Sequence, residues 1–225
     1  MRPLPGWRAA LVCLVAGATG VEAQAAPRWY EFSRDASVIY VVTHRSGLLS
    51  FLGHEHAIAV KDWAGGVCWT AGSPAGAYGW LSADSRTLEI DTDSARALAD
   101  LGGGPSAGQL RGIRQKFRDS HHLASEEYPQ ITLDSLVVRE RAQDRWVAEG
   151  RLTIRDRTRP VEITFLVLES DSASVQLSGT LEVKQSDFGI RPESIAGVVR
   201  VTDTVDIHFD LLARAGSARC TPSAR

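Results

Sequence analysis

Apolar and polar residues alternate along most of this chain, which predicts β-strands that bury one face. The clearest stretch is 175–184, where apolar side chains and Gly179 alternate with polar side chains. The same pattern predicts strands over 37–44, 54–63, 67–70, 78–83, 87–91, 131–138, 146–154, 161–167 and 205–211. About eight to ten strands must close into a barrel or split into a tight sandwich, because open edges pair with other chains.

One region departs from the alternation and predicts helices. Thr92-Asp93-Ser94 can cap a short helix over 95–101, which Gly102-Gly103-Gly104-Pro105 would end. Leu110, Ile113 and Phe117 then recur at helical spacing between basic residues. This predicts an amphipathic helix that lies on the barrel or closes one end of it. Its apolar stripe is only as wide as core packing needs, which favours a solvated basic face over membrane binding.

The first 25 residues have the layout of a secretory signal peptide. Arg2 and Arg8 precede or flank a short apolar run over 9–18, and Ala23-Gln24-Ala25 offers a cleavage site. The run is too short to span a bilayer as a helix. We therefore expect a mature protein that is periplasmic or secreted.

The rest of the chain predicts one β-rich domain over 27–214 and a disordered tail over 215–225, where small and charged residues dominate. No later segment approaches ~18 unbroken apolar residues, so no integral membrane segment is expected. Cleavage would remove two arginines and one glutamate, which changes the formal charge from −2 to −3. Such a mildly acidic chain has no electrostatic footprint for nucleic acid. The pattern does not decide between a monomer and a homodimer.

After cleavage two cysteines remain, Cys68 and Cys220. An oxidising compartment permits a disulfide between them, but the sequence does not bring them near each other. Two free thiols are the simpler interpretation, and the pairing stays open.

Four stretches carry a family resemblance when they are taken in order. They are Ser37-Val38-Ile39-Tyr40-Val41-Val42-Thr43-His44, the run over 121–135 with its Tyr128-Pro129-Gln130-Ile131, Gly150-Arg151-Leu152-Thr153-Ile154 followed by Thr158-Arg159-Pro160-Val161, and Ser186-Asp187-Phe188-Gly189-Ile190 followed by Val201-Thr202-Asp203-Thr204-Val205. From Trp29 to about Arg214, the chain resembles the YceI-like family of exported lipid-binding proteins. The chain departs from the usual family pattern at Asp156, where glycine is common, and at Gly53-His54-Glu55-His56.

The resemblance implies an all-β fold, an extended lipocalin-like antiparallel barrel of about eight strands with one or two short helices. It also implies a long apolar cavity that holds a polyisoprenoid or a fatty-acyl-like lipid. The expected wall consists of alternate apolar strand positions. To these we add aromatic side chains, which offer large contact area at low entropic cost: Tyr40, Phe51, Trp63, Trp69 and Trp80.

Three of the six histidines lie within a short stretch, at His44, His54 and His56. His54 and His56 share a strand face with Ile58, whereas Glu55 shares the opposite face. If Ile58 faces the interior, the two histidines lie near one end of the cavity. There, together with His44, they could hydrogen-bond the polar headgroup of a ligand.

A metal site at His44, His54 and His56 is the alternative, because a His-x-His pair on a strand suits Zn²⁺ or Cu²⁺. The cupin pattern does not fit, since Gly47 is one residue too far from His54 and no glutamate follows soon after His56. We therefore expect no metal and no cofactor.

Motifs for catalysis do not appear in the sequence. There is no G-x-S-x-G, and Gly102-Gly103-Gly104 lacks the lysine and hydroxyl of a phosphate loop. The sequence thus predicts a binding or carrier protein rather than an enzyme. The competing hypotheses are a metal-dependent enzyme or metal carrier, and a β-domain with a filled core.

Overall fold

The computed structural model describes residues 26–46, 54–142, 145–192, 194–195 and 199–220. The expected signal peptide over 1–25 and the candidate wall residue Phe51 lie outside the described residues.

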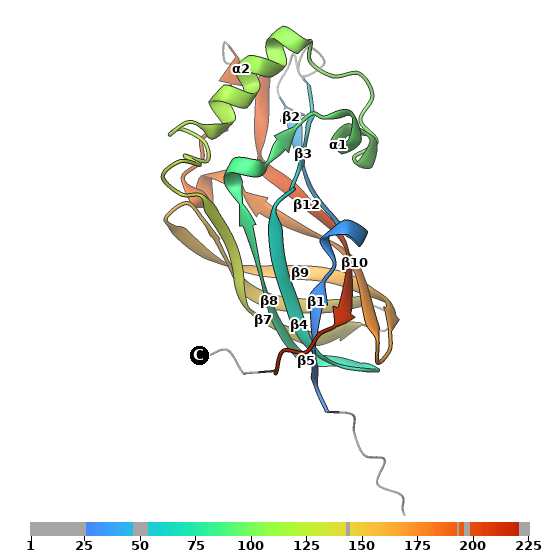
Figure 1. Ribbon diagram of the computed structural model, residues 1–225. Coiled ribbons are helices and arrows are strands. Elements are labelled where there is room, and N and C mark those ends of the chain that lie inside the picture. The colour runs from blue at the N-terminus through green and yellow to red at the C-terminus, as the bar shows by residue number, and fades with distance from the viewer. Residues whose placement is uncertain (1–25, 47–53, 143–144, 193, 196–198, 221–225) are drawn as a thin grey trace, which may run out of the picture.

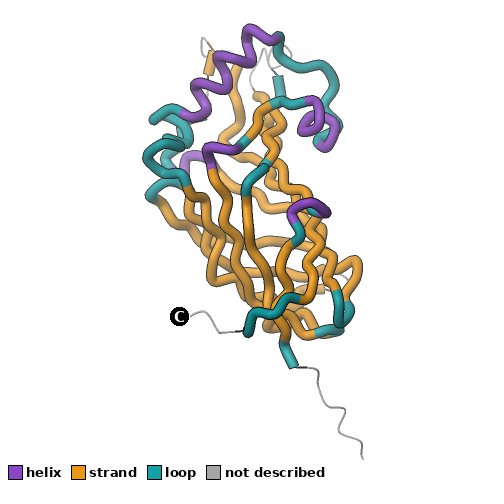
Figure 2. Tube along the Cα trace, viewed as in Figure 1, coloured by secondary structure: helices purple, strands orange, loops and turns teal. Residues whose placement is uncertain are grey.

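Eight antiparallel strands close into a barrel (Figures 1 and 2). In order around the barrel they are β1 (Arg28–Phe32), β4 (Trp63–Thr70), β5 (Ser73–Asp84), β7 (Gln130–Ala142), β8 (Arg145–Ile154), β9 (Arg157–Ser170), β10 (Ser174–Lys184) and β12 (Val199–Ala215). Strand β1 closes the ring, because it pairs with β4 along one edge and with the end of β12 along the other. The predicted all-β barrel is confirmed.

A second set of strands extends the wall from the first half of β12. It consists of β2 (Val38–Ser46), β3 (His56–Ala59) and β6 (Glu89–Ile90), while β11 (Ser194–Ile195) also pairs with β12. Across these strands Ile207 lies opposite Val41, Val41 opposite Ile58, and Ile58 opposite Ile90. This row of apolar side chains shares one face of the wall.

Two α-helices follow β6, as the sequence predicts. Helix α1 (Asp93–Leu98) begins after Thr92, whose side chain accepts a hydrogen bond from the Ala95 N–H. Helix α2 (Ala107–Arg118) begins with a capping box between Ser106 and Gln109 and lies across one end of the barrel (Figure 1). Short 3₁₀ turns are η1 (Arg34–Ala36), η3 (Ser85–Thr87) and η4 (Gln185–Phe188). Within the described chain, neither helix has the length and apolar composition to cross a membrane.

Strand β1 and the first half of β4 were not predicted as strands. For β4 the reason is visible at Gly66, where an added Cβ would lie 2.4 Å from the Trp29 ring and 2.5 Å from the Tyr30 carbonyl oxygen. Close approach of β1 therefore requires glycine inside β4, and glycine masks the alternating pattern. The single strand predicted over 54–63 is instead two strands, because the chain bends between Ala59 and Trp63.

The end of the chain is attached to the barrel. Ala215 is the last residue of β12, and the Gly216 N–H donates to the Trp29 carbonyl oxygen over 2.9 Å. Cys220 forms a disulfide with Cys68 of β4, with the two Cα atoms 5.6 Å apart. The prediction of disorder from residue 215 is therefore wrong for 215–220, because strand pairing and a covalent bond hold this segment.

Candidate ligand-binding cavity

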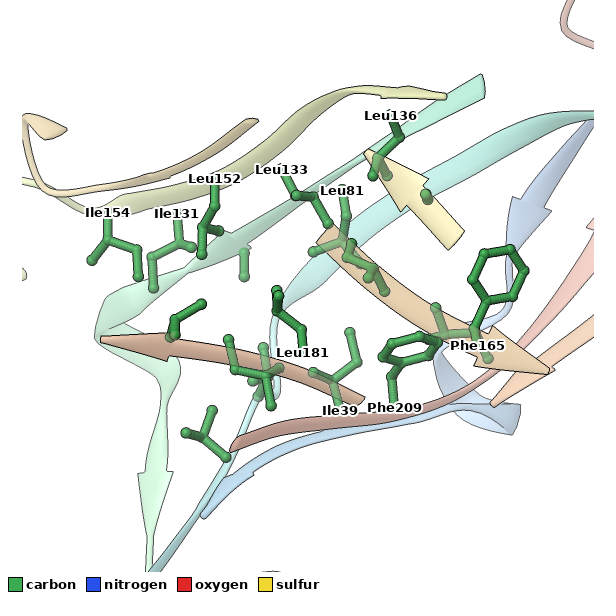
Figure 3. Close-up of a pocket in the computed structure, with 18 of the residues that line it drawn as sticks. Ile39, Leu81, Ile131, Leu133, Leu136, Leu152, Ile154, Phe165, Leu181 and Phe209 are labelled. Atoms are coloured by element: carbon green, nitrogen blue, oxygen red, sulfur yellow. The ribbon is translucent and has the colours of Figure 1, made fainter. Parts of the chain in front are cut away.

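The barrel encloses a cavity of about 250 Å³. Alternate residues of its strands line the cavity, and Phe117 of α2 lies in the wall at one end. Figure 3 shows aliphatic and aromatic side chains converging on this space from both sides of the barrel. The labelled residues are Ile39, Leu81, Ile131, Leu133, Leu136, Leu152, Ile154, Phe165, Leu181 and Phe209.

Few polar side-chain atoms belong to this wall. Among the described residues that line it, only Thr43, Trp69, Tyr78 and Gln185 carry them. The Trp69 Nε1–H donates to Ser170 Oγ over 2.9 Å, and the Gln185 amide donates to the Thr202 carbonyl oxygen over 2.9 Å. The cavity is therefore suited to an apolar ligand, because its wall offers few hydrogen-bonding partners to a polar group.

The end of the barrel away from α2 is filled by buried side chains. Tyr30, Trp69 and Val175 are almost completely buried there, and the Tyr30 hydroxyl donates to the Asp171 carbonyl oxygen over 2.8 Å. The end near α2 holds Phe117 and the two side chains Thr43 and Gln185. Of the four polar side chains of the wall, Thr43 and Gln185 thus lie at the α2 end, whereas Trp69 and Tyr78, which pairs with Cys68, lie toward the filled end.

The structure separates the three predicted tryptophans. Trp69 lines the cavity. Trp63 is buried against the lining residues Ile39 and Ala83 but is not itself one of them. Trp80 is 44% exposed and stacks on Trp29, with ring centroids 6.4 Å apart. Trp80 points outward because its neighbours Gly79 and Leu81 face the cavity.

Tyr40 and His44 also lie on the outer surface. Ile39, Val41 and Thr43 line the cavity, so the alternate residues of β2 point away from it. The Tyr40 ring stacks on His208 with centroids 4.9 Å apart. His44 Nε2 lies 2.8 Å from the Asp206 carboxylate.

His56 begins β3 opposite Thr43, on the same face as Ile58. Its ring, however, turns to Asp91, with Nδ1 2.6 Å from Oδ2, and is not one of the lining side chains. His54 lies just before β3 and is half-buried. The three histidines do not converge on a common point. In the described part of the chain, no group of three or more His, Cys, Asp or Glu side chains is arranged to hold a metal ion, so the metal alternative is not favoured.

A model of the YceI-like domain matches residues 46–213, which is most of the barrel. The chain belongs to the YceI-like family. A search of curated protein sequences finds no match.

Solved structures share the fold of this YceI-like chain at low sequence identity. Burkholderia cenocepacia BcnA is 18% identical with a TM-score of 0.60, over 80% of this chain and 98% of that one. A polyisoprenoid binding domain from Saccharophagus degradans is 14% identical with a TM-score of 0.53, over 83% and 98%. The Campylobacter jejuni YCEI protein is 10% identical with a TM-score of 0.53, over 71% and 85%.

Sequence reasoning missed a buried ionic cluster of this YceI-like barrel. The side chain of Asp91 is 1% exposed and accepts hydrogen bonds from Arg96 Nη1 over 2.7 Å and from the Ala57 N–H over 3.1 Å, beside the His56 ring. Burial alone would raise the pKa of Asp91, but the bonds from His56, Ala57 and Arg96 outweigh it and hold the pKa below its usual value. The local sequence resembles an ordinary helix cap and carries no sign of this burial.

Proposed function

We propose that this chain binds an apolar chain compound, a polyisoprenoid or a fatty-acyl-like lipid, inside the barrel, and acts as an exported binding or carrier protein rather than an enzyme. The observation that carries the proposal is the apolar cavity of about 250 Å³ with very few polar side-chain atoms in its wall. This volume of about 250 Å³ lies just below the range of ~300–1,000 Å³ that is usual for ligand pockets. A slender chain suits such a space better than a bulky ring system.

The class of ligand is supported by the family and by one relative in particular. The Saccharophagus degradans domain of the same fold is described as polyisoprenoid binding. Each methylene that enters an apolar wall contributes about 0.8 kcal/mol. Association costs several kcal/mol, so a chain of ten or so methylenes can bind without a specific polar contact.

A polar headgroup would lie at the α2 end. Thr43 and Gln185 line the cavity there, and His56 pairs with Thr43 across β2 and β3. Because the opposite end is filled by Tyr30 and Trp69, a ligand that enters tail first would leave its headgroup beside Thr43. Only one or two donors or acceptors are needed to orient such a group.

Export to the periplasm or outside the cell is part of the proposal. The pattern over 1–25 is that of a secretory signal peptide. The disulfide between Cys68 and Cys220 supports the same compartment, because such bonds persist where the environment is oxidising.

The test is native mass spectrometry of protein purified from its own host, followed by extraction with organic solvent. An extractable polyisoprenoid or fatty-acyl lipid at near-equal molar amount is expected, and full recovery of protein with no such ligand would contradict the proposal. A second test uses quenching of tryptophan fluorescence by an added polyisoprenoid in solution. Trp69→Phe should remove much of the quenching, whereas Trp80→Phe, on the outer surface, should leave it intact.

A further inference from the structure

Helix α2 is incompletely covered by the barrel that it closes. None of its twelve residues is fully buried. Ile113 and Phe117 pack against the main core while remaining only partly buried, and Leu110 is half-buried as well. The sequence led us to expect a stripe just wide enough for core packing, but the structure leaves part of this stripe accessible.

The charge on α2 is entirely positive. The helix carries Arg111, Arg114, Lys116 and Arg118 and has no acidic residue. Arg111, Arg114 and Arg118 are exposed and are spaced three and seven residues apart, so they lie along one face beside the apolar stripe. An apolar stripe flanked by arginines is the arrangement of helices that lie in the interface of an anionic membrane, where long basic side chains reach the phosphates.

The position of α2 joins this face to the cavity. Phe117 lies in the cavity wall, on the same stripe as Leu110 and Ile113. Figure 1 shows α2 lying across this end of the barrel. The apolar stripe of α2 therefore reaches from the outer part of the helix to one side chain of the cavity wall.

We infer that the α2 end of the barrel docks on an anionic phospholipid bilayer and that the ligand passes between bilayer and cavity along this helix. The inference rests on the proposed function for its ligand and on the charge of α2 for its partner. The sign of that charge selects an anionic surface over a zwitterionic one. Each basic side chain near an anionic leaflet strengthens binding roughly fivefold.

The experiment measures co-sedimentation of the delipidated full-length mature protein with vesicles. One set of vesicles contains phosphatidylcholine and phosphatidylglycerol in equal parts, and the other contains phosphatidylcholine alone. We expect binding to the first set, weak binding to the second, and a fall in binding as salt is raised. The double variant Arg111→Glu/Arg118→Glu should bind the anionic vesicles at least about 25-fold more weakly.

A matched control reverses two exposed arginines at the filled end of the barrel, Arg28→Glu/Arg214→Glu. Arg28 begins β1 opposite Trp69, and its guanidinium donates to the Ser172 carbonyl oxygen. Arg214 lies near the end of β12, opposite Glu31 of β1 and Ser174 of β10. The control has the same net charge as the α2 variant and should keep most of the vesicle binding.

Equal loss in both variants, or equal binding to both sets of vesicles, would overturn the inference. The inference would also be overturned if the protein binds no vesicles and forms a dimer that the Leu110→Ser variant dissociates. In that case a second copy of the chain would cover α2. If the α2 variant does not fold, the salt series on the unaltered protein decides, and salt-independent binding overturns the inference. Failure of polyisoprenoid to quench Trp69 in solution would instead count against the proposed function, whatever the vesicles show.

Discussion

His56 Nδ1 and Asp91 Oδ2 are 2.6 Å apart, at the point where β3, β6 and α1 meet. Asp91 also accepts a hydrogen bond from Arg96, whose guanidinium reaches the carbonyl oxygens of Glu55 and Gly103 as well. One buried carboxylate thus connects the start of β3 to α1 and to the loop that leads into α2. We regard this cluster as the device that positions the helices at the cavity end.

Replacement of Asp91 by asparagine should strongly destabilise the barrel. The change keeps the shape of the side chain but removes the negative charge that Arg96 and His56 face. Breaking one side of a buried ion pair costs about 3 kcal/mol or more, because the remaining charge is left without a partner. The free energy of unfolding from urea titration at neutral pH would measure the loss. A loss below that of a surface control such as Asp62→Asn would contradict a structural role for the cluster.

The same cluster should make stability depend on pH in the acid range. The folded-state pKa of Asp91 lies below its usual value, and the unfolded-state value is about 3.9. The ionised carboxylate therefore contributes stability above the unfolded-state pKa, and this contribution is lost as pH falls through the lower folded-state pKa. We expect the stability difference between the unaltered protein and Asp91→Asn to shrink below about pH 4. A difference that stays constant down to acid unfolding would be incompatible with the lowered pKa.

The barrel could be predicted from the sequence because alternation is a local property that survives in most strands. Prediction failed where the reason for a residue lies in another part of the chain. Position 66 requires glycine because Trp29 and Tyr30 of another strand come close to it, and the partners that bury Asp91 lie in β3 and α1. Neither the need for glycine nor the burial of Asp91 can be recognised from the neighbouring residues in the sequence.

The residues of the candidate site also differ in whether the local sequence could place them. Strand parity alone could have shown that Tyr40 and His44 point away from Ile39 and Val41, and that Trp80 points away from Leu81. Trp69 is in the cavity wall and was predicted there. Thr43 was missed although the same parity places it with Ile39 and Val41, and Gln185 was missed because its place in the wall depends on how η4 meets the barrel in space.

Loss of the disulfide should lower stability by about 2–4 kcal/mol, because Cys68 and Cys220 close a loop that spans most of the domain. Cys220→Ser and the reduced protein should show similar losses in urea unfolding. Addition of reductant to Cys220→Ser should then have no further effect. A reductant-dependent change in that variant would show that the cysteines pair in some other way.

Gly112→Ala should stabilise the protein by about 0.5–1 kcal/mol, since glycine inside a helix is less favourable than alanine, and Gly108→Ala, in the first turn of α2, should stabilise it by less. An added Cβ meets no atom within 4 Å at either position, so nothing opposes the gain. Urea unfolding of the two single variants would measure it. Destabilisation in either variant would mean that α2 packs more tightly than the structure shows.

Two alanines distinguish an open cavity from a filled core. Ala148 lines the cavity, whereas Ala213 is completely buried in the core and does not line it. Ala213→Leu should cost about 1–3 kcal/mol, the usual effect of overpacking. Ala148→Leu should cost clearly less, because the added atoms enter empty space, and it should weaken polyisoprenoid binding by occupying part of the cavity. Equal costs in urea unfolding, together with unchanged quenching of Trp69, would favour a filled core and no ligand.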